Sequence, residues 1–222
     1  MKNLFLLLIT VLSCWLFQSC QDKTKVSVTS NEDQTETPAT HMDTMGSHHE
    51  NQSMMQSMKG KMAEMNMMKM TGDFDQDFAN MMIMHHQSAI DMSEVVLTSG
   101  TDPQVKSMAQ NIINTQKLEI VQMQEFAGKH KMNPAKMEHG EMHNELAEIM
   151  KKMETTMMSM QMSGNPDKDF LMMMIPHHES AVTMAESEIE HGKEFELKKL
   201  AQKIISDQNK EIEGFKAWIS TH

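Results

Sequence analysis

The sequence feature that most constrains the fold is an internal repeat. Residues 81–86 read MMIMHH and residues 172–178 read MMMIPHH, so two adjacent histidines follow a run of methionines twice, 92 residues apart (177 minus 85). The match extends to both sides of the histidines. At the same offset Phe78 pairs with Phe170, Ser88 with Ser180, Met92 with Met184, Ile112 with Ile204, Gln116 with Gln208, Glu119 with Glu211 and Phe126 with Trp218. The chain therefore contains two copies of one unit.

Each copy is expected to be a helical hairpin. A helical pattern over residues 73–99 begins with several aspartates, which suit the positive end of a helix dipole, and stops at Gly100. Asp102 and Pro103 then supply an N-cap and a first-turn proline for the next helix, and Asn165 opens the counterpart in the second copy. Two hairpins can bury their apolar stripes face to face, so we predict an all-α four-helix bundle with a pseudo-two-fold axis.

Two methionine-rich segments precede the hairpins and predict extra helices. Met55, Met58, Met62 and Met65 are spaced by three and four residues, which places them on one helical face, and residues 137–162 show a similar pattern. The predicted organisation is a signal peptide at 1–19, a flexible tether at 20–47, a methionine-rich helix at 48–72, a first hairpin at 73–131, a methionine-rich crossover helix at 137–163 and a second hairpin at 164–222.

The first residues have the pattern of an export signal. Lys2 is followed by an apolar run from Leu4 to Phe17, which is too short to span a bilayer comfortably, and then by Cys20. This pattern favours a bacterial lipoprotein that is cleaved before Cys20 and anchored to the membrane through it, outside the cytoplasm. Cleavage at Cys14, or a plain secretory signal without a lipid, are the alternatives.

Composition excludes several classes of function. The chain has two cysteines, and removal of residues 1–19 would remove Cys14, so neither a disulfide scaffold nor a thiolate metal site is expected. The net charge is −11 and the sequence has no arginine, which argues against binding to nucleic acid.

Histidine and methionine are the residues with metal-binding chemistry. Residues four apart are neighbours on a helix, so each His-His pair has thioethers one turn before it. Thioethers are soft ligands that suit Cu(I) and Ag(I), and imidazole is borderline. The predicted ligands are His85, His86, His177, His178, Met81, Met82, Met92, Met173, Met174 and Met184. Auxiliary ligands are expected at His48, His49, Met54, Met58, Met62, His139 and His143.

Packing is the alternative explanation for these residues, because methionine at helical spacing often fills a core. Adjacent helical residues also point about 100° apart, so one histidine of each pair is expected to be the ligand and the other to bind another helix. Gln116, Glu119, Gln208 and Glu211 are candidates to hold these imidazoles. Pro176 predicts a kink in the second copy, where the first copy has Met84.

The segments DFANMMIMHHQSAIDMSE and DFLMMMIPHHESAVTMAES, each followed by a helix with a Q…EI pattern, resemble the domain of unknown function 305 family. The resemblance covers roughly residues 73–220 and implies a ferritin-like helical bundle. It also implies copper binding and copper resistance, because some extracytoplasmic members have been linked to both.

Three functions remain open from the sequence. The first is a membrane-anchored protein that sequesters or carries Cu(I), with Ag(I) as a mimic and a copper-export or copper-chaperone protein as partner. The second is a ferritin-like di-metal oxidoreductase, which needs Glu-x-x-His pairs on two helices, a spacing found here only at Glu188 and His191. The third is a bundle that binds a partner protein through methionines and no metal.

Overall fold

Six helices and no strand make up the part of the chain that the structure describes. This computed structural model describes the backbone of residues 44–132 and 141–222 and the side chains of residues 54–132 and 144–222. The helices are α1 (Thr44–Asn66), α2 (Phe74–Ser99), α3 (Pro103–Lys129), α4 (Glu141–Met158), α5 (Pro166–His191) and α6 (Phe195–Ile219). Within these ranges no helix is long and apolar enough to cross a membrane.

Some of the predictions concern residues outside these ranges. The signal peptide, the tether up to residue 43, the anchor Cys20 and the auxiliary ligand His139 all lie outside the described residues. The side chains of His48, His49 and His143 are likewise not described, although their backbones belong to α1 and α4.

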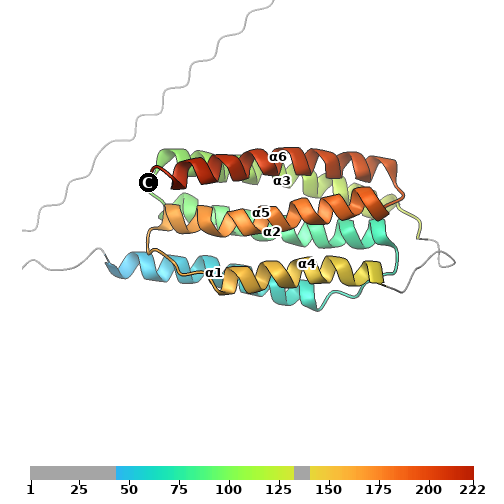
Figure 1. Cartoon of the computed structure of the whole chain (residues 1–222), viewed down its shortest axis with the longest axis horizontal. Coiled ribbons are helices and arrows are strands. Elements are labelled where there is room, and N and C mark those ends of the chain that lie inside the picture. The colour runs from blue at the N-terminus through green and yellow to red at the C-terminus, as the bar shows by residue number, and fades with distance from the viewer. Residues whose placement is uncertain (1–43, 133–140) are drawn as a thin grey trace, which may run out of the picture. The chain divides into compact units, whose positions relative to one another are not determined.

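The helices form three layers of two, with α2 and α5 in the middle (Figure 1). α2 packs against α3 and α5 against α6, so each repeat is a helical hairpin, and the two hairpins meet mainly along α2 and α5. This confirms the all-α bundle of four repeated helices. α1 and α4 cover the other side of α2 and α5.

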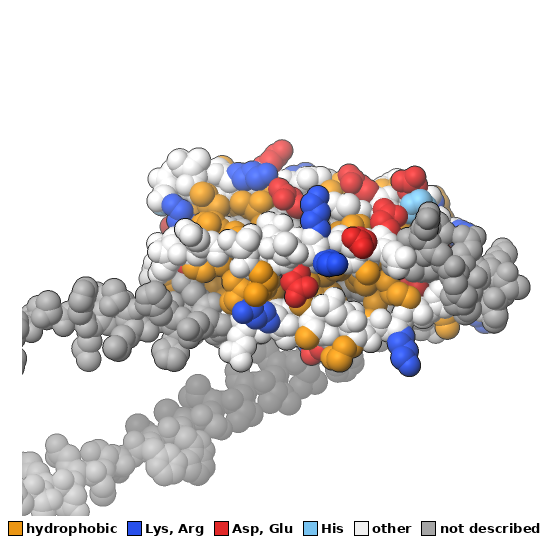
Figure 2. All heavy atoms as spheres, turned by 60° about the horizontal axis from the view of Figure 1, so that its bottom comes forward, with side chains coloured by type: hydrophobic (Ala, Val, Ile, Leu, Met, Phe, Trp, Pro, Cys, Tyr) orange, Lys and Arg blue, Asp and Glu red, His pale blue; other side chains and the backbone are white. Residues whose placement is uncertain are grey.

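The methionine stripes of α1 and α4 face into this arrangement. The stripe positions are fully or almost fully buried in one hydrophobic core, namely Met54, Met58, Met62 and Met65 on α1 and Leu146, Met150, Met153 and Met157 on α4. Over these two helices some apolar side chains also reach the surface between scattered charged ones (Figure 2). The methionine-rich segments are therefore part of the core and are not loose appendages to it.

The helix ends follow the predicted signals. The side chain of Asp102 caps α3 by accepting hydrogen bonds from the N–H groups of Gln104 and Val105, and Asn165 caps α5 in the same way. Pro176 lies inside α5, and the helix continues past it to His191.

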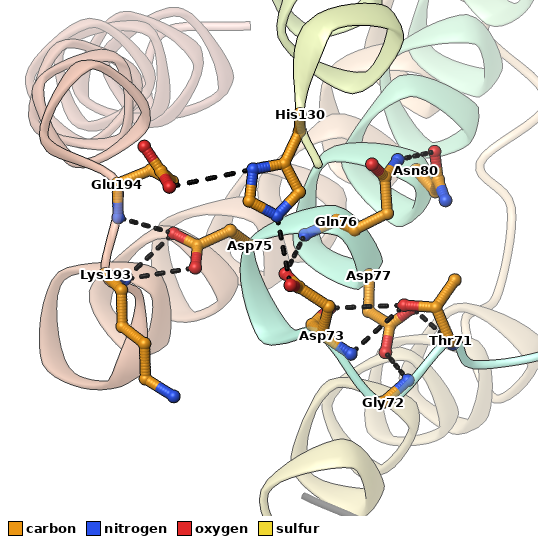
Figure 3. Close-up of polar contacts among 10 residues, drawn as sticks. All are labelled: Thr71, Gly72, Asp73, Asp75, Gln76, Asp77, Asn80, His130, Lys193 and Glu194. Atoms are coloured by element: carbon orange, nitrogen blue, oxygen red, sulfur yellow. Dashed lines mark hydrogen bonds and ion pairs between the residues drawn. The ribbon is translucent and has the colours of Figure 1, made fainter. Parts of the chain in front are cut away.

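The first aspartate of the repeated Asp-x-Asp-Phe motif connects the two hairpins. Asp75 of α2 accepts hydrogen bonds from the backbone N–H groups of Lys193 and the following residue, in the turn between α5 and α6 (Figure 3). Its counterpart Asp167 of α5 accepts from the N–H and hydroxyl of Thr101 and from the N–H of Asp102, in the turn between α2 and α3. Each hairpin therefore caps the turn of the other.

The second aspartate of the motif holds the turn that precedes its own helix. Asp77 accepts hydrogen bonds from both N–H groups of Thr71–Gly72 and from the threonine hydroxyl (Figure 3), and Asp169 does the same for Ser163–Gly164. Both glycines have positive φ, 87° and 85°, a conformation that favours glycine. The four aspartates thus place α2 and α5 at matching heights, which brings the repeated histidines level.

Candidate metal centre

His85 of α2 and His177 of α5 meet at the centre of the bundle. Both side chains are completely buried, and their ring centroids are 3.7 Å apart with an interplanar angle of 37°. The first histidine of each repeat is therefore the one that meets its counterpart from the other hairpin. The two rings come from helices that are 92 residues apart in sequence, so only the packing of one hairpin against the other brings them together.

The second histidine of each pair turns away from this axis. His86 Nε2 lies 2.8 Å from Glu119 Oε2 of α3, and His178 Nε2 lies 2.8 Å from Glu211 Oε2 of α6. Glu119 also accepts a hydrogen bond from Lys203 of α6. Burial alone would raise the pKa of Glu119, but the hydrogen bonds and positive charges of His86 and Lys203 outweigh it and lower the pKa. One histidine of each pair therefore contacts a glutamate of the neighbouring helix, as predicted, and a metal-binding role for the other stays a prediction.

The two glutamines considered as imidazole partners do not play that role. Gln116 and Gln208 are buried, but their amide atoms make no hydrogen bond to any described residue. Ser180 does contact the central pair, since its hydroxyl lies 2.9 Å from His85 Nε2. The repeat marked this serine together with Ser88, yet its sequence position alone does not indicate which histidine it reaches.

The central histidines are held in their neutral form. Burial lowers the pKa of His85 well below its usual value, and the neighbouring His177 lowers it further. Burial likewise lowers the pKa of His177, with added effects from His178 and His86. A neutral imidazole keeps a lone pair on one ring nitrogen, which is the form that binds a metal ion.

Several ring nitrogens of the buried histidines have no hydrogen-bond partner among the described residues. They are both nitrogens of His177 and the Nδ1 atoms of His85, His86 and His178. Leaving buried polar atoms unsatisfied is costly, so a protein rarely does it without a ligand or a special role for them. Unpartnered imidazole nitrogens in a methionine-rich core fit a soft metal ion.

All six methionines predicted as main ligands are buried in the hydrophobic core. Met81, Met82, Met92, Met173, Met174 and Met184 are at most 3% exposed. The auxiliary candidates Met54, Met58 and Met62 are equally buried. The structure shows these side chains packed in the core, as both the packing and the metal-binding explanations require.

Glu188 and His191, which have the spacing of a ferritin-like di-metal site, face different partners. Glu188 faces Asp75, whereas His191 lies 3.3 Å from Glu145 Oε2 of α4. In the chain as far as it is described, no group of three or more histidine, cysteine, aspartate or glutamate residues could hold a metal ion. A metal at the centre would therefore be held by fewer than three of these residue types, with other donors such as thioethers completing its coordination.

Comparison with known proteins agrees with the repeat and the fold. The model of a family described as a domain of unknown function (DUF305) matches residues 9–127 and 75–219. The chain belongs to the DUF305 family. A search of the curated proteins found no match. A solved DUF305 fragment from Deinococcus radiodurans shares 21% identity with this chain and a TM-score of 0.50, and the match covers 67% of this chain and 97% of the fragment.

Closer sequence similarity is found to structures of the protein CopM. CopM in the Ag-bound form is 32% identical with a TM-score of 0.51, and the match covers 69% of this DUF305 chain and 98% of CopM. CopM in the Cu(I)-bound form is 33% identical with a TM-score of 0.50, and the match covers 66% and 96% of the two chains. This DUF305 protein is therefore similar to one whose structures contain silver and copper.

Proposed function

We propose that this DUF305 protein binds Cu(I), with Ag(I) as a mimic, at the centre between α2 and α5. The observation that carries the proposal is the buried, neutral pair His85 and His177, whose ring nitrogens largely lack partners. Imidazole and thioether together prefer a soft monovalent ion, and the absence of a carboxylate cluster in the described residues argues against a hard one. The similarity to Cu(I)-bound and Ag-bound CopM supports this choice of metal.

The proposed role is sequestration or transfer of Cu(I) outside the cytoplasm, which would contribute to copper tolerance. The apolar run that ends at Cys20 supports export and attachment to a membrane through a lipid on that residue. In such a compartment methionine is a better soft ligand than cysteine, because a thioether does not form disulfides. The protein would act as a binding protein and not as an enzyme, and a copper-export or copper-chaperone protein would be its partner.

The proposed site includes further histidines and methionines besides the central pair. His86 and His178, through their hydrogen bonds to Glu119 and Glu211, would orient the helices that carry the central rings. The surrounding methionines, Met81, Met82, Met92, Met173, Met174 and Met184, would supply thioethers. His48, His49, His139, His143 and the methionines of α1 would serve as auxiliary ligands.

The test is an anaerobic Cu(I) titration of the purified full chain against a competing chromogenic chelator. The double variant His85→Gln/His177→Gln removes both central imidazoles while keeping polar side chains of similar size. We expect the Cu(I) affinity to fall at least about 100-fold. Removing a residue that only orients a metal ligand typically lowers the affinity 10- to 100-fold, and removing the ligand itself should lower it further.

The matched control is His130→Gln/His191→Gln. These two histidines lie in ion pairs with Asp73 and Glu145 and not in the central pair. The control should keep the affinity of the unmodified chain, and circular dichroism should show that both double variants are folded. If the unmodified chain binds no Cu(I), the proposed function is wrong. If the central variant binds as tightly as the control, the proposed site is wrong.

A further inference from the structure

The hydroxyl of Ser180 contacts two candidate metal-ligand atoms, an imidazole nitrogen and a thioether sulfur. Its Oγ lies 2.9 Å from His85 Nε2 of α2 and 2.9 Å from Met153 Sδ of α4. It also lies 2.6 Å from the carbonyl oxygen of His177, one turn earlier on α5. His85, Met153 and Ser180 are all nearly or completely buried. Three helices therefore bring an imidazole and a thioether into contact with one small hydroxyl group.

These contacts cannot all be satisfied hydrogen bonds. A serine hydroxyl has one proton to donate, and the carbonyl oxygen and the sulfur are both acceptors. The carbonyl is the shorter contact and the stronger acceptor, so the proton belongs there. The sulfur of Met153 then lies close to the serine oxygen without receiving a hydrogen bond from it. The lone pairs of this buried thioether therefore remain available to another ligand or ion.

The internal repeat places a matching serine and histidine on the other side of the axis. Ser88 is the counterpart of Ser180, and His177 is the counterpart of His85. The 92-residue offset aligns Met153 with Lys61, and the next residue, Met62, is a buried methionine of α1. Here neither the hydroxyl of Ser88 nor either ring nitrogen of His177 has a hydrogen-bond partner among the described residues.

We infer that Met153 and His85 together ligate one Cu(I) ion, and that the hydroxyl of Ser180 occupies the ion's position until copper displaces it. His177 and Ser88 form a second candidate site, for which the buried Met62 of α1 would supply the thioether. This inference rests on the proposed function and adds to it the ligands that α1 and α4 contribute. Cu(I) binds thioether and imidazole in preference to a neutral hydroxyl. When the side chain of Ser180 rotates away, the ion can therefore take the position of the hydroxyl beside His85 and Met153. No redox step is involved: the serine keeps its proton, and the Nε2 proton of His85 moves to the unpartnered Nδ1 as Nε2 binds the ion.

The first experiment measures Cu(I) affinity and stoichiometry for single variants of the full chain. Met153→Leu removes the sulfur at nearly constant volume, and we expect it to abolish one of two Cu(I) ions or to weaken it at least about tenfold. Ser180→Ala removes the competing hydroxyl and should strengthen the same site by roughly two- to tenfold, the effect of losing one hydrogen bond. Met123→Leu is the control, since Met123 is just as buried but lies on α3. It should bind like the unmodified chain.

The second experiment reports ligation directly. The chain is labelled with ¹³C at the methionine methyl groups and titrated with Ag(I), and the resonances that disappear in Met153→Leu and Met62→Leu identify those two methyl groups. Both should shift when Ag(I) is added, whereas the resonance of Met123 should not. If the unmodified chain binds Cu(I) and loses it in His85→Gln/His177→Gln, but keeps it in Met153→Leu with no shift at either methyl, this inference is wrong and the proposed function stands. Loss of binding in Ser180→Ala, with the fold retained, would also overturn the inference, because the hydroxyl would then be a ligand.

Discussion

Glu188 should make the stability of the bundle depend on pH. It lies on α5, is completely buried, and occupies the position that Val96 has in the first repeat (188 minus 92). Burial, followed by the negative charge of Asp75, raises the pKa of Glu188 to about 9, with a further rise from Asp73 and an opposing effect of Lys198. Both of its carboxyl oxygens lack a donor among the described residues, as expected if the group is protonated and donates its own proton to Asp75.

The size of the effect follows from the shift of this pKa from 4.5 to about 9. Between these values the unfolded chain has released the proton that the folded chain keeps, so unfolding releases a proton and stability falls as the pH rises. The slope is about 1.4 kcal/mol per pH unit. Relative to acidic solution, Glu188 therefore lowers the free energy of unfolding by about 3 kcal/mol at pH 7. Between pH 7 and pH 8.5 it should lower this free energy by about 2 kcal/mol more. Above pH 9 the dependence ends.

The decisive perturbation is Glu188→Gln, because the amide can donate a hydrogen bond to Asp75 at every pH. We expect urea unfolding, followed by helical circular dichroism, to show a more stable variant at pH 8.5 and little change between pH 7 and pH 8.5. Glu188→Val, which copies Val96, is a second variant that also lacks the titrating group. If the unmodified chain has the same free energy of unfolding at both pH values, or if all three chains lose stability in parallel, the assignment of a protonated Glu188 is refuted.

Three further predictions concern the architecture that supports the centre. Phe170→Ala should lower the free energy of unfolding by about 3–5 kcal/mol, while Leu118→Ala, at a side chain 66% exposed, should change it by less than about 0.5 kcal/mol. Asp167→Ala should lower it by about 2–3 kcal/mol, because three donors in the turn between α2 and α3 lose a charged acceptor. Glu119→Gln should lower it by about 1–2 kcal/mol near neutral pH by weakening the bond to His86, and this difference should shrink in acid, since the pKa of Glu119 is lowered and its contribution is lost as it becomes protonated. Urea unfolding of each variant checks all three.

The parts of the fold that depend on local spacing could be predicted from the sequence. Apolar periodicity and the caps at Asp102 and Asn165 locate the helices, because capping is a contact between residues two or three apart. The 92-residue repeat implies two equal hairpins, and two equal hairpins packed about an axis bring His85 and His177 together. The 100° step between adjacent helical residues similarly directs His86 towards Glu119.

The aspartates show where local reasoning was insufficient. Their position in the first turn suggested an interaction with the helix dipole, and the sequence gives no sign that Asp75 and Asp167 cap the turns of the opposite hairpins. Glu188 was noted only for its spacing to His191, whereas the structure pairs it with Asp75. Each of these contacts joins residues more than 60 positions apart, so no periodic pattern encodes it.

By itself, then, the sequence determined that the chain forms two histidine-bearing helical hairpins with methionine-rich helices beside them. Only the tertiary structure decided which atoms meet at the centre, such as the hydroxyl of Ser180 with His85 and Met153. The physical reason is that helix spacing specifies the face on which a residue lies, but not how far one helix slides or rotates against another. That choice depends on how all the buried side chains fill the core together, and a shift of one turn would change every partner of the site.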